Sequence, residues 1–142
     1  ILLLENTAGE KNSVGSSFEH IRGIMDGLEK INRIGVCLDT CHAFAAGYEL
    51  RTETGIKETL AQFDDQIGMR NLRIIHLNDS KGDRGSALDR HEHIGMGFIG
   101  EDGFRRILHH PVLSALPLIC ETPVDDRRDD VGNIEKVREL AK

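Results

Sequence analysis

The stretch that decides the fold is Ile34–Asp39, with the sequence IGVCLD. It is a short, apolar, β-branched run of the kind that forms a buried strand, and it ends on a side chain that can bind a metal ion. The same pattern occurs three more times. The four runs are residues 1–5, 34–39, 72–76 and 118–121, and they end at Glu5, Asp39, His76 and Glu121. We therefore predict four strands that each deliver one ligand.

Segments with the apolar spacing of amphipathic helices follow the four runs. Ser16 and Glu19 form a capping box before the first helix, while Gly68 and Pro111 are stop signals after the second and third. The apolar positions are Phe18, Ile21, Ile24, Met25, Leu28 and Ile31, then Ile56, Leu60, Phe63 and Ile67, then Phe104, Ile107 and Leu108, and finally Ile134, Val137 and Leu140. Strands alternating with helices imply parallel pairing with right-handed crossovers.

Four strand–helix units are half of the eight in a TIM (β/α)8 barrel. We predict an α/β fold in which residues 1–142 form a single half-barrel. The chain starts on Ile1, inside an apparent strand, so we expect a fragment of a larger one-domain barrel enzyme. An isolated half-barrel has two unpaired sheet edges. It should therefore pair with the other half of the barrel or associate with itself through those edges.

Side-chain alternation along the strands predicts which residues face the barrel axis. In the stretch from residue 34 to 39, Ile34, Val36 and Leu38 would face the helices. The side chains expected on the inner face are Gly35, Cys37 and Asp39 in that strand, Leu72, Ile74 and His76 in the next, and Ile119 and Glu121 in the last. All three strands would thus present their metal ligand at the barrel axis.

Composition limits the cellular setting and the partners. Three cysteines are an odd number without a C-x-x-C pair, which argues against a disulfide framework and favours a reduced, cytoplasmic setting. No apolar run approaches the roughly 18 residues that span a bilayer, so we expect no membrane insertion. The net charge of −6 at first disfavours nucleic acid. Bound divalent ions would add positive charge where a phosphate binds, so a phosphate substrate stays possible.

The ends of the four strands predict a metal site. In parallel α/β folds the active site lies at the carboxyl ends of the strands, so Glu5, Asp39, His76 and Glu121 should converge there. Three carboxylates and an imidazole held together need a cation, and a divalent metal is the usual one.

Two loop motifs predict a second site. His42 follows Asp39 by three residues, and Asp89-Arg90-His91 follows a glycine-rich loop after His76. Together His42, Asp89 and His91 would supply three ligands and leave coordination positions open, as catalytic metal sites do.

Several of these residues have other interpretations. Asp39 or Glu121 alone could cap the following helix. His93 could replace His91 or support it from behind, although we favour His91 as the ligand. Cys37 and Cys41 are more simply small packing residues than zinc ligands. Three basic side chains are expected in loops at the mouth of the barrel, where the strands end, and they could contact DNA phosphates or be merely solvated. These are Arg51, Lys81 and Arg84.

The chain resembles endonuclease IV, the zinc-dependent apurinic/apyrimidinic endonuclease family of base-excision repair, over its whole length. The resemblance rests on residues 5–9, residues 35–42, residues 76–81 with Asp89 and His91, and Glu121-Thr122-Pro123. It implies that the chain is the C-terminal half of the barrel. Met96 and Phe98 stand where the family has more polar side chains, so details of that loop are expected to differ.

The resemblance also implies ligands and a reaction. Glu5 would bridge the first and second of three zinc ions, Asp39, His76 and Glu121 would complete the second, and His42, Asp89 and His91 would hold the third. Glu5 and Glu121 are the predicted catalytic carboxylates. The first site also needs histidines from earlier strands, so about two ions are expected here, with manganese possible in place of zinc. The implied reaction is hydrolysis of the phosphodiester 5′ to abasic sites in double-stranded DNA.

Two other functions remain open. Sugar isomerases and epimerases of the related barrel superfamily use a similar Glu, Asp, His, Glu set around one metal. Such an enzyme has no need of a further His42, Asp89 and His91 triad, which separates the two predictions. The chain alone could also be a non-catalytic, metal-binding fragment.

Overall fold

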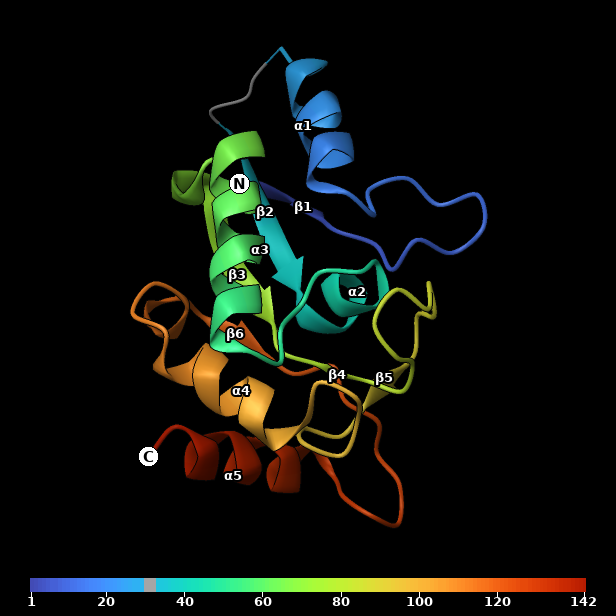
Figure 1. Ribbon diagram of the computed structural model, residues 1–142, viewed down its shortest axis with the longest axis vertical. Helices are drawn as coiled ribbons and strands as arrows, with labels where there is room; N and C mark the ends of the chain where they lie inside the picture. The colour runs from blue at the N-terminus through green and yellow to red at the C-terminus, as the bar shows by residue number, and fades with distance from the viewer. Residues whose placement is uncertain (30–32) are drawn as a thin grey trace.

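A computed structural model describes residues 1–29 and 33–142 of the chain. Its main sheet is parallel, with the order β1-β2-β3-β6 (Figure 1). The strands are β1 (Leu2–Glu5), β2 (Ile34–Asp39), β3 (Leu72–His76) and β6 (Leu118–Ile119). Strand order follows chain order, with a crossover helix in each connection. The predicted α/β fold of four parallel strand–helix units is therefore confirmed.

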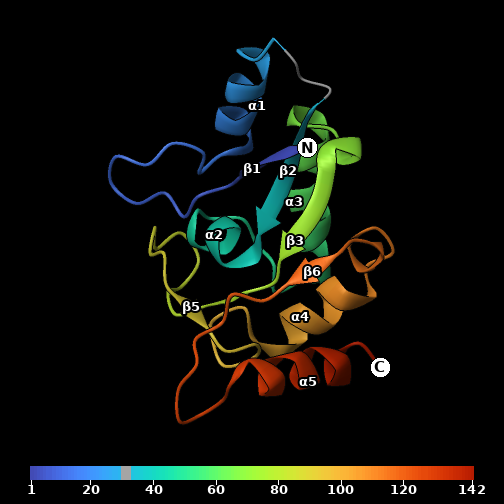
Figure 2. The ribbon, with the colours of Figure 1, turned by 180° about the vertical axis from the view of Figure 1, so that it is seen from behind.

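The long helices lie on one side of the sheet. They are α1 (Phe18–Asp26), α3 (Glu53–Gln66), α4 (Gly100–His109) and α5 (Asp130–Leu140). Viewed from behind, the strands lie in front of α3 and α4, and no helix in the described part of the chain crosses that sheet face (Figure 2). None of the described helices combines the length and apolar character needed to cross a bilayer. The sheet thus has one covered face and one open face.

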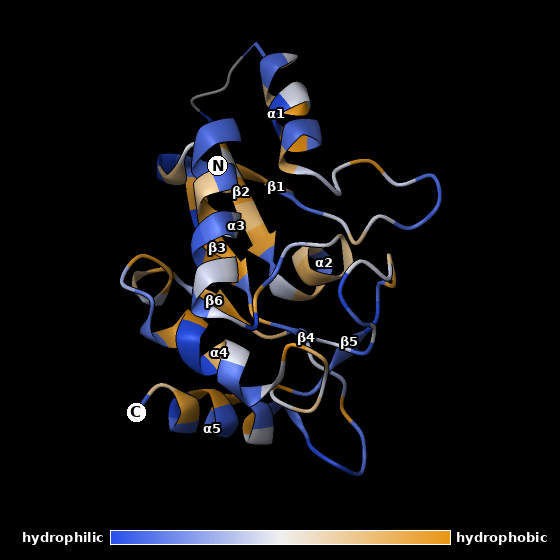
Figure 3. Ribbon diagram, in the orientation of Figure 1, coloured by the Kyte–Doolittle hydropathy of each residue, from blue (hydrophilic) through white to orange (hydrophobic). Residues whose placement is uncertain are grey.

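The core lies between the sheet and these helices. Phe18, Phe44, Phe63 and Phe104 are at most 2% exposed there. The ring of Phe18 stacks on Tyr48 at 4.1 Å and meets Phe63 edge-on at 5.1 Å. In Figure 3 the strands are the most apolar elements, and the loops beyond their carboxyl ends are mostly hydrophilic. Apolar packing therefore holds the strands, and the polar chemistry gathers where they end.

The first helix is shorter than its apolar spacing predicted. Its N-cap is Ser17, whose hydroxyl accepts a hydrogen bond from the backbone of His20, so the predicted capping box at Ser16 is wrong. The helix ends at Asp26, and Leu28 lies beyond it with 39% of its surface exposed. Gly27 ends the helix because it favours the helical state least of the ordinary residues. The predicted position Ile31 lies outside the described residues.

An irregularity in β3 changes which residues face the axis. Val36 pairs with Leu72 and Cys37 with Ile74, so Arg73 is an extra residue in the ladder. Leu72 and Ile75 both pack into the core with the helices. The prediction that Leu72 shares the inner face with His76 is therefore wrong. A Cβ atom on Gly35 would lie 2.6 Å from Cγ of Arg73, which explains why glycine stands opposite the bulge.

The described part of the chain also contains short elements that were not predicted from the sequence. A short helix, α2 (Thr40–Ala45), begins directly after β2, without an intervening loop. Two-residue strands β4 (Asp79–Ser80) and β5 (His91–Glu92) pair antiparallel beyond β3. The last strand is also shorter than residues 118–121, because β6 ends at Ile119. Glu121 therefore lies two residues beyond the sheet. Short 3-10 helices, η2 (Met69–Asn71) and η3 (Leu113–Ala115), precede β3 and β6.

One buried carboxylate organises the loop before α4. The Asp79 side chain is fully buried and accepts hydrogen bonds from five backbone N–H groups, those of Ser80, Gly95, Gly97, Ile99 and Gly100, at 2.8–3.3 Å. Burial raises the pKa of Asp79, and the backbone donors oppose that rise by stabilising the charged form. The loop is thereby wrapped tightly around a single side chain.

We expect Gly97→Ala to destabilise the protein by about 1–3 kcal/mol, because overpacking at a close approach forces the backbone to move. A Cβ atom there would lie 2.6 Å from Oδ1 of Asp79 and would also collide with the carbonyl oxygen of Ser80. Urea unfolding measures the change. Gly23→Ala is the matched control. It lies inside α1 with no atom within 4 Å of the new methyl group, and should stabilise by about 0.5–1 kcal/mol. Equal effects of the two changes would contradict this description of the loop.

Candidate metal centre

The four strand ends bring the first predicted ligand group together. Nδ1 of His76 lies 3.1 Å from Oε1 of Glu5, 3.1 Å from Oε2 of Glu121 and 4.0 Å from Oδ2 of Asp39. One donor atom from each of the four residues lies within 4.8 Å of all the others. The Asp39 side chain is fully buried, whereas those of Glu5 and Glu121 are 36% and 47% exposed. The group is therefore anchored at its base and open to solvent at its rim.

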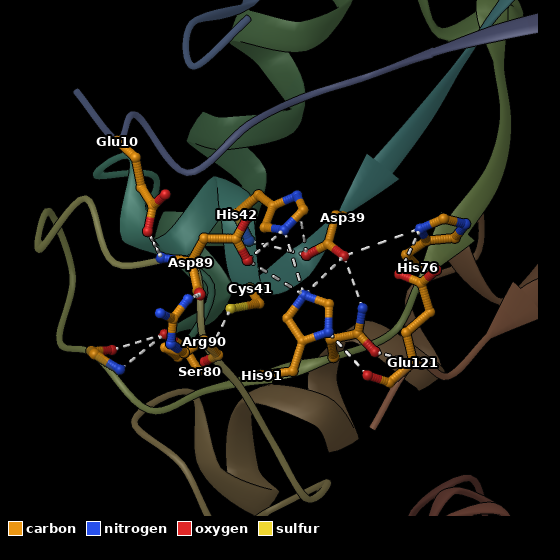
Figure 4. A network of polar contacts seen from close by, with 12 residues as sticks. Glu10, Asp39, Cys41, His42, His76, Ser80, Asp89, Arg90, His91 and Glu121 are labelled. Atoms are coloured by element: carbon orange, nitrogen blue, oxygen red, sulfur yellow. Dashed lines mark hydrogen bonds and ion pairs between the residues drawn. The ribbon is translucent and has the colours of Figure 1, made fainter. Parts of the chain in front are cut away.

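The second predicted group lies beside the first. Nε2 of His42 lies 3.1 Å from Oδ1 of Asp89 and 3.3 Å from Nε2 of His91 (Figure 4). These three residues also offer donor atoms within 4.8 Å of one another. Nε2 of His91 lies 3.6 Å from Oδ2 of Asp39, so the two groups are neighbours. The structure thus brings together all seven residues that we predicted as ligands.

The start of α2 fixes the geometry of Asp39 and His42. Oδ1 of Asp39 accepts a hydrogen bond of 2.9 Å from the backbone N–H of His42, so Asp39 is the N-cap of this helix. Its interpretation as a helix cap therefore holds alongside its place in the ligand group. One helical turn carries His42 over the strand end, where its Nδ1 lies 2.9 Å from the carbonyl oxygen of Asn6. The same hydrogen bond therefore begins the helix and places the side chains of Asp39 and His42 beside each other.

The donor chemistry of these groups fits a divalent metal. Burial by itself lowers the pKa of His42, but the neighbouring carboxylates of Asp39, Asp89 and Glu5 raise it above its ordinary value on balance. The Nε2 atoms of His42 and His91 lie 3.3 Å apart, and the carboxylates of Asp39 and Asp89 lie beside them. Imidazole nitrogen and carboxylate oxygen are the usual ligands of zinc, and carboxylates also suit manganese. A bound cation would attract these electron-pair donors, which otherwise repel one another.

Two cysteines line the same region. Cys37 offers a sulfur within 4.8 Å of donor atoms of Glu5 and His76, and Cys41 does so for Asp39 and His91. Both side chains are buried, which, with nearby carboxylates, raises the pKa of each thiol to about 12. Sγ of Cys41 donates instead to the carbonyl oxygen of Arg90 at 3.5 Å. These neutral thiols pack behind the carboxylates and imidazoles.

His93 lies apart from both groups. Its ring is fully buried, with Nε2 3.0 Å from Oδ1 of Asp125 and Nδ1 3.0 Å from Nδ2 of Asn133. Nε2 of His91, in contrast, points into the second group, and its Nδ1 lies 2.9 Å from the carbonyl oxygen of Glu121. The geometry accordingly favours His91 as the ligand, and His93 ties β5 to the segment before α5.

The three basic residues suggested as phosphate contacts differ in their surroundings. Arg51 makes a two-point ion pair with Glu49, at 2.7 Å and 2.9 Å, and lies over the ring of Phe44. This pairing lowers the pKa of Glu49 to about 2. Arg84 also approaches Glu49, at 3.4 Å. Lys81 is exposed directly after β4. A role of Arg51 or Arg84 in DNA binding would therefore compete with Glu49.

Sequence reasoning missed the buried amides behind the ligands. Asn6 bonds the backbone of Asp39 twice, accepting from its N–H at 2.7 Å and donating to its carbonyl at 3.1 Å. Asn78 donates to Oδ2 of Asp39 at 2.7 Å and accepts from the backbone N–H of Glu121 at 2.7 Å. The available signal was position, because each asparagine follows a strand by one or two residues.

Comparison with known proteins defines the family. The sequence model of the family described as a xylose isomerase-like TIM barrel matches residues 1–142. The chain belongs to this family. It is 64% identical over 141 residues to the "Probable endonuclease 4" of Methanoculleus marisnigri, covering 99% of this chain and 50% of that protein. It is 48% identical over 137 residues to the "Apurinic-apyrimidinic endonuclease 1" of Plasmodium falciparum, covering 96% of this chain and 22% of that protein.

A solved structure extends the resemblance to the fold. Endonuclease IV from Thermus thermophilus superposes with a TM-score of 0.81 at 37% identity, covering 98% of this chain and 48% of that one. The resemblance to endonuclease IV is therefore confirmed in sequence and in fold. The chain spans about half the length of the Methanoculleus and Thermus proteins.

We expect the purified chain to bind two divalent metal ions, because the two ligand groups share no residue. His42→Ala should leave one ion bound, while Asp102→Ala, an exposed carboxylate in the first turn of α4, should leave two. Plasma mass spectrometry of protein prepared without chelator counts the ions. Unchanged stoichiometry in His42→Ala would contradict the second site.

Proposed function

We propose that this chain carries most of the active site of a zinc-dependent apurinic/apyrimidinic endonuclease, which hydrolyses the phosphodiester 5′ to abasic sites in double-stranded DNA. Its half-barrel would be one part of a larger barrel domain. The names of the Methanoculleus, Plasmodium and Thermus relatives support this reaction class. The observation that carries the proposal is the adjacency of two ligand groups at one mouth, since Asp39 of the first lies 3.6 Å from His91 of the second.

The charge at the mouth explains how an acidic protein could act on DNA. The chain has a net charge of −6, and carboxylates concentrate at the strand ends. Metal ions bound there would neutralise phosphate charge and lower the pKa of a bound water to near 7. The chain's own side chains determine where such ions are held and which face of the site stays accessible.

The exposed carboxylates are the groups that can meet the substrate. Glu5 and Glu121 lie at the rim, 36% and 47% exposed, and each approaches Nδ1 of His76 at 3.1 Å. A water held between them can pass its proton to a carboxylate as it attacks phosphorus. Asp39 is fully buried and cannot reach the substrate. We therefore propose that Glu5 and Glu121, besides being ligands, orient the water and accept its proton, and that Asp39 serves as a ligand only.

A sugar isomerase or epimerase is the competing function. The first ligand group alone would suit a single-metal enzyme of that kind. The second group argues against it, because His42, Asp89 and His91 gather at the same mouth and turn their donor atoms toward one another. Phosphodiester hydrolysis uses further positive charge on the leaving oxygen, which a second group can supply.

Incision of abasic DNA tests the proposal in a complete barrel, made by placing this chain after the N-terminal half of its M. marisnigri relative. His42→Ala or Asp89→Ala should lower kcat for cleavage at least about 10²-fold, as removal of charge stabilisation does. Both residues lie in mouth segments rather than the core, so the barrel should stay folded by circular dichroism. Asp102→Ala is the control with unchanged rate. Full incision without the second metal would contradict the proposal, and retained sugar isomerisation would favour the competing function.

We further propose that the chain alone associates through its open edges and lacks incision activity. Ile1 and Leu2 at one edge and Ile119 at the other are 80%, 64% and 44% exposed. Exposed edge strands pair readily with other chains. Sedimentation at micromolar concentration should detect dimers or larger species, and adding the N-terminal half of the relative should restore some incision. A stable monomer would contradict the association, and robust incision by the chain alone, abolished by Glu121→Gln, would contradict the need for the other half.

A further inference from the structure

We infer that Asn78 is a positioning residue that holds two ligands of the first group in register through one side chain. Its amide lies between β2 and the segment after β6, and it contacts Asp39 with its nitrogen and Glu121 with its oxygen. This inference rests on the proposed metal site. It assigns to Asn78 the task of setting the distance between a buried ligand and an exposed one.

The first half of the argument concerns Asp39. Its Oδ1 accepts from the N–H of His42 at 2.9 Å, and its Oδ2 accepts from Nδ2 of Asn78 at 2.7 Å. Each oxygen thus has one fixed donor, so the carboxylate cannot rotate without losing a hydrogen bond. The remaining lone pairs of both oxygens stay available for a cation. Asn78 therefore sets the plane of the buried carboxylate.

The second half concerns Glu121, which the sheet does not hold directly. Strand β6 ends at Ile119, whose carbonyl oxygen accepts the last ladder hydrogen bond, from the N–H of Leu77 at 2.7 Å. Two residues later, the N–H of Glu121 donates to Oδ1 of Asn78 at 2.7 Å. Asn78 thus takes over where the sheet ends and fixes the backbone from which the Glu121 carboxylate projects.

The orientation of the Asn78 amide is itself determined. Its side chain is completely buried, and its backbone is held on both sides by Thr40, whose hydroxyl accepts from the Asn78 N–H at 2.9 Å and donates to the Asn78 carbonyl at 2.7 Å. The amide matches these two partners, because its nitrogen donates to Asp39 and its oxygen accepts from Glu121. Leucine and alanine have neither group.

Metal affinity of the first group is the test, measured by chelator competition in a His42→Ala background. Asn78→Leu and Asn78→Ala should each weaken the affinity for zinc about 10- to 100-fold, as loss of a hydrogen-bond partner behind a ligand does. Alanine adds no charge and is smaller than asparagine, so Asn78→Ala tests the role if Asn78→Leu does not fold. Circular dichroism of the metal-free variants reports folding separately from metal binding.

Asn133→Leu is the matched control, because Asn133 is equally buried but bonds Ile94, His93 and Asp129 rather than any ligand of the first group. It should lower the unfolding midpoint while leaving zinc affinity unchanged. Unchanged zinc affinity in both Asn78 variants would contradict the role of Asn78, and so would an equal loss of zinc affinity in Asn133→Leu. Either result would leave the proposed metal site standing. Absence of zinc binding by the chain without any substitution would overturn the proposed metal site together with this inference.

Discussion

The crowding of like charges at the carboxyl ends of the parallel strands is the constraint on which this structure depends. Parallel strands that share one direction must bring their last side chains to one edge of the sheet. Here that edge carries Glu5, Asp39, His76 and Glu121, and α2 and β5 add His42 and His91 beside them. Apolar packing on the covered face of the sheet offsets the repulsion between these carboxylates. A bound cation would attract all of them and so remove the repulsion.

Buried amides determine how that crowding is ordered. Without donors and acceptors of matched geometry, a fully buried carboxylate such as Asp39 would be costly to hold in its charged form. Asn6 holds its backbone and Asn78 holds its side chain. The carboxylates of Glu5 and Glu121 are 36% and 47% exposed, so water solvates them and they need less support from the protein. The site thus changes from buried to solvated between its base and its rim.

Much of this organisation could be predicted from the sequence because periodicity and position carried the information. The stretch IGVCLD predicted its strand and its core-facing residues correctly. The prediction failed where local hydrogen bonding competed with periodicity. Ser17 rather than Ser16 caps α1, the bulge at Arg73 turns Leu72 to the core, and β6 ends before Glu121. The roles of Asn6 and Asn78 could not be predicted, since they depend on residues more than 30 positions away.

Anomalous diffraction from crystals of the zinc-loaded chain tests the central claim most directly, because it places each ion relative to the side chains. The proposed function predicts two zinc peaks, one bound by Glu5, Asp39, His76 and Glu121 and the other by His42, Asp89 and His91. A single peak, or peaks coordinated by Cys37 or Cys41 in place of these residues, would contradict the account.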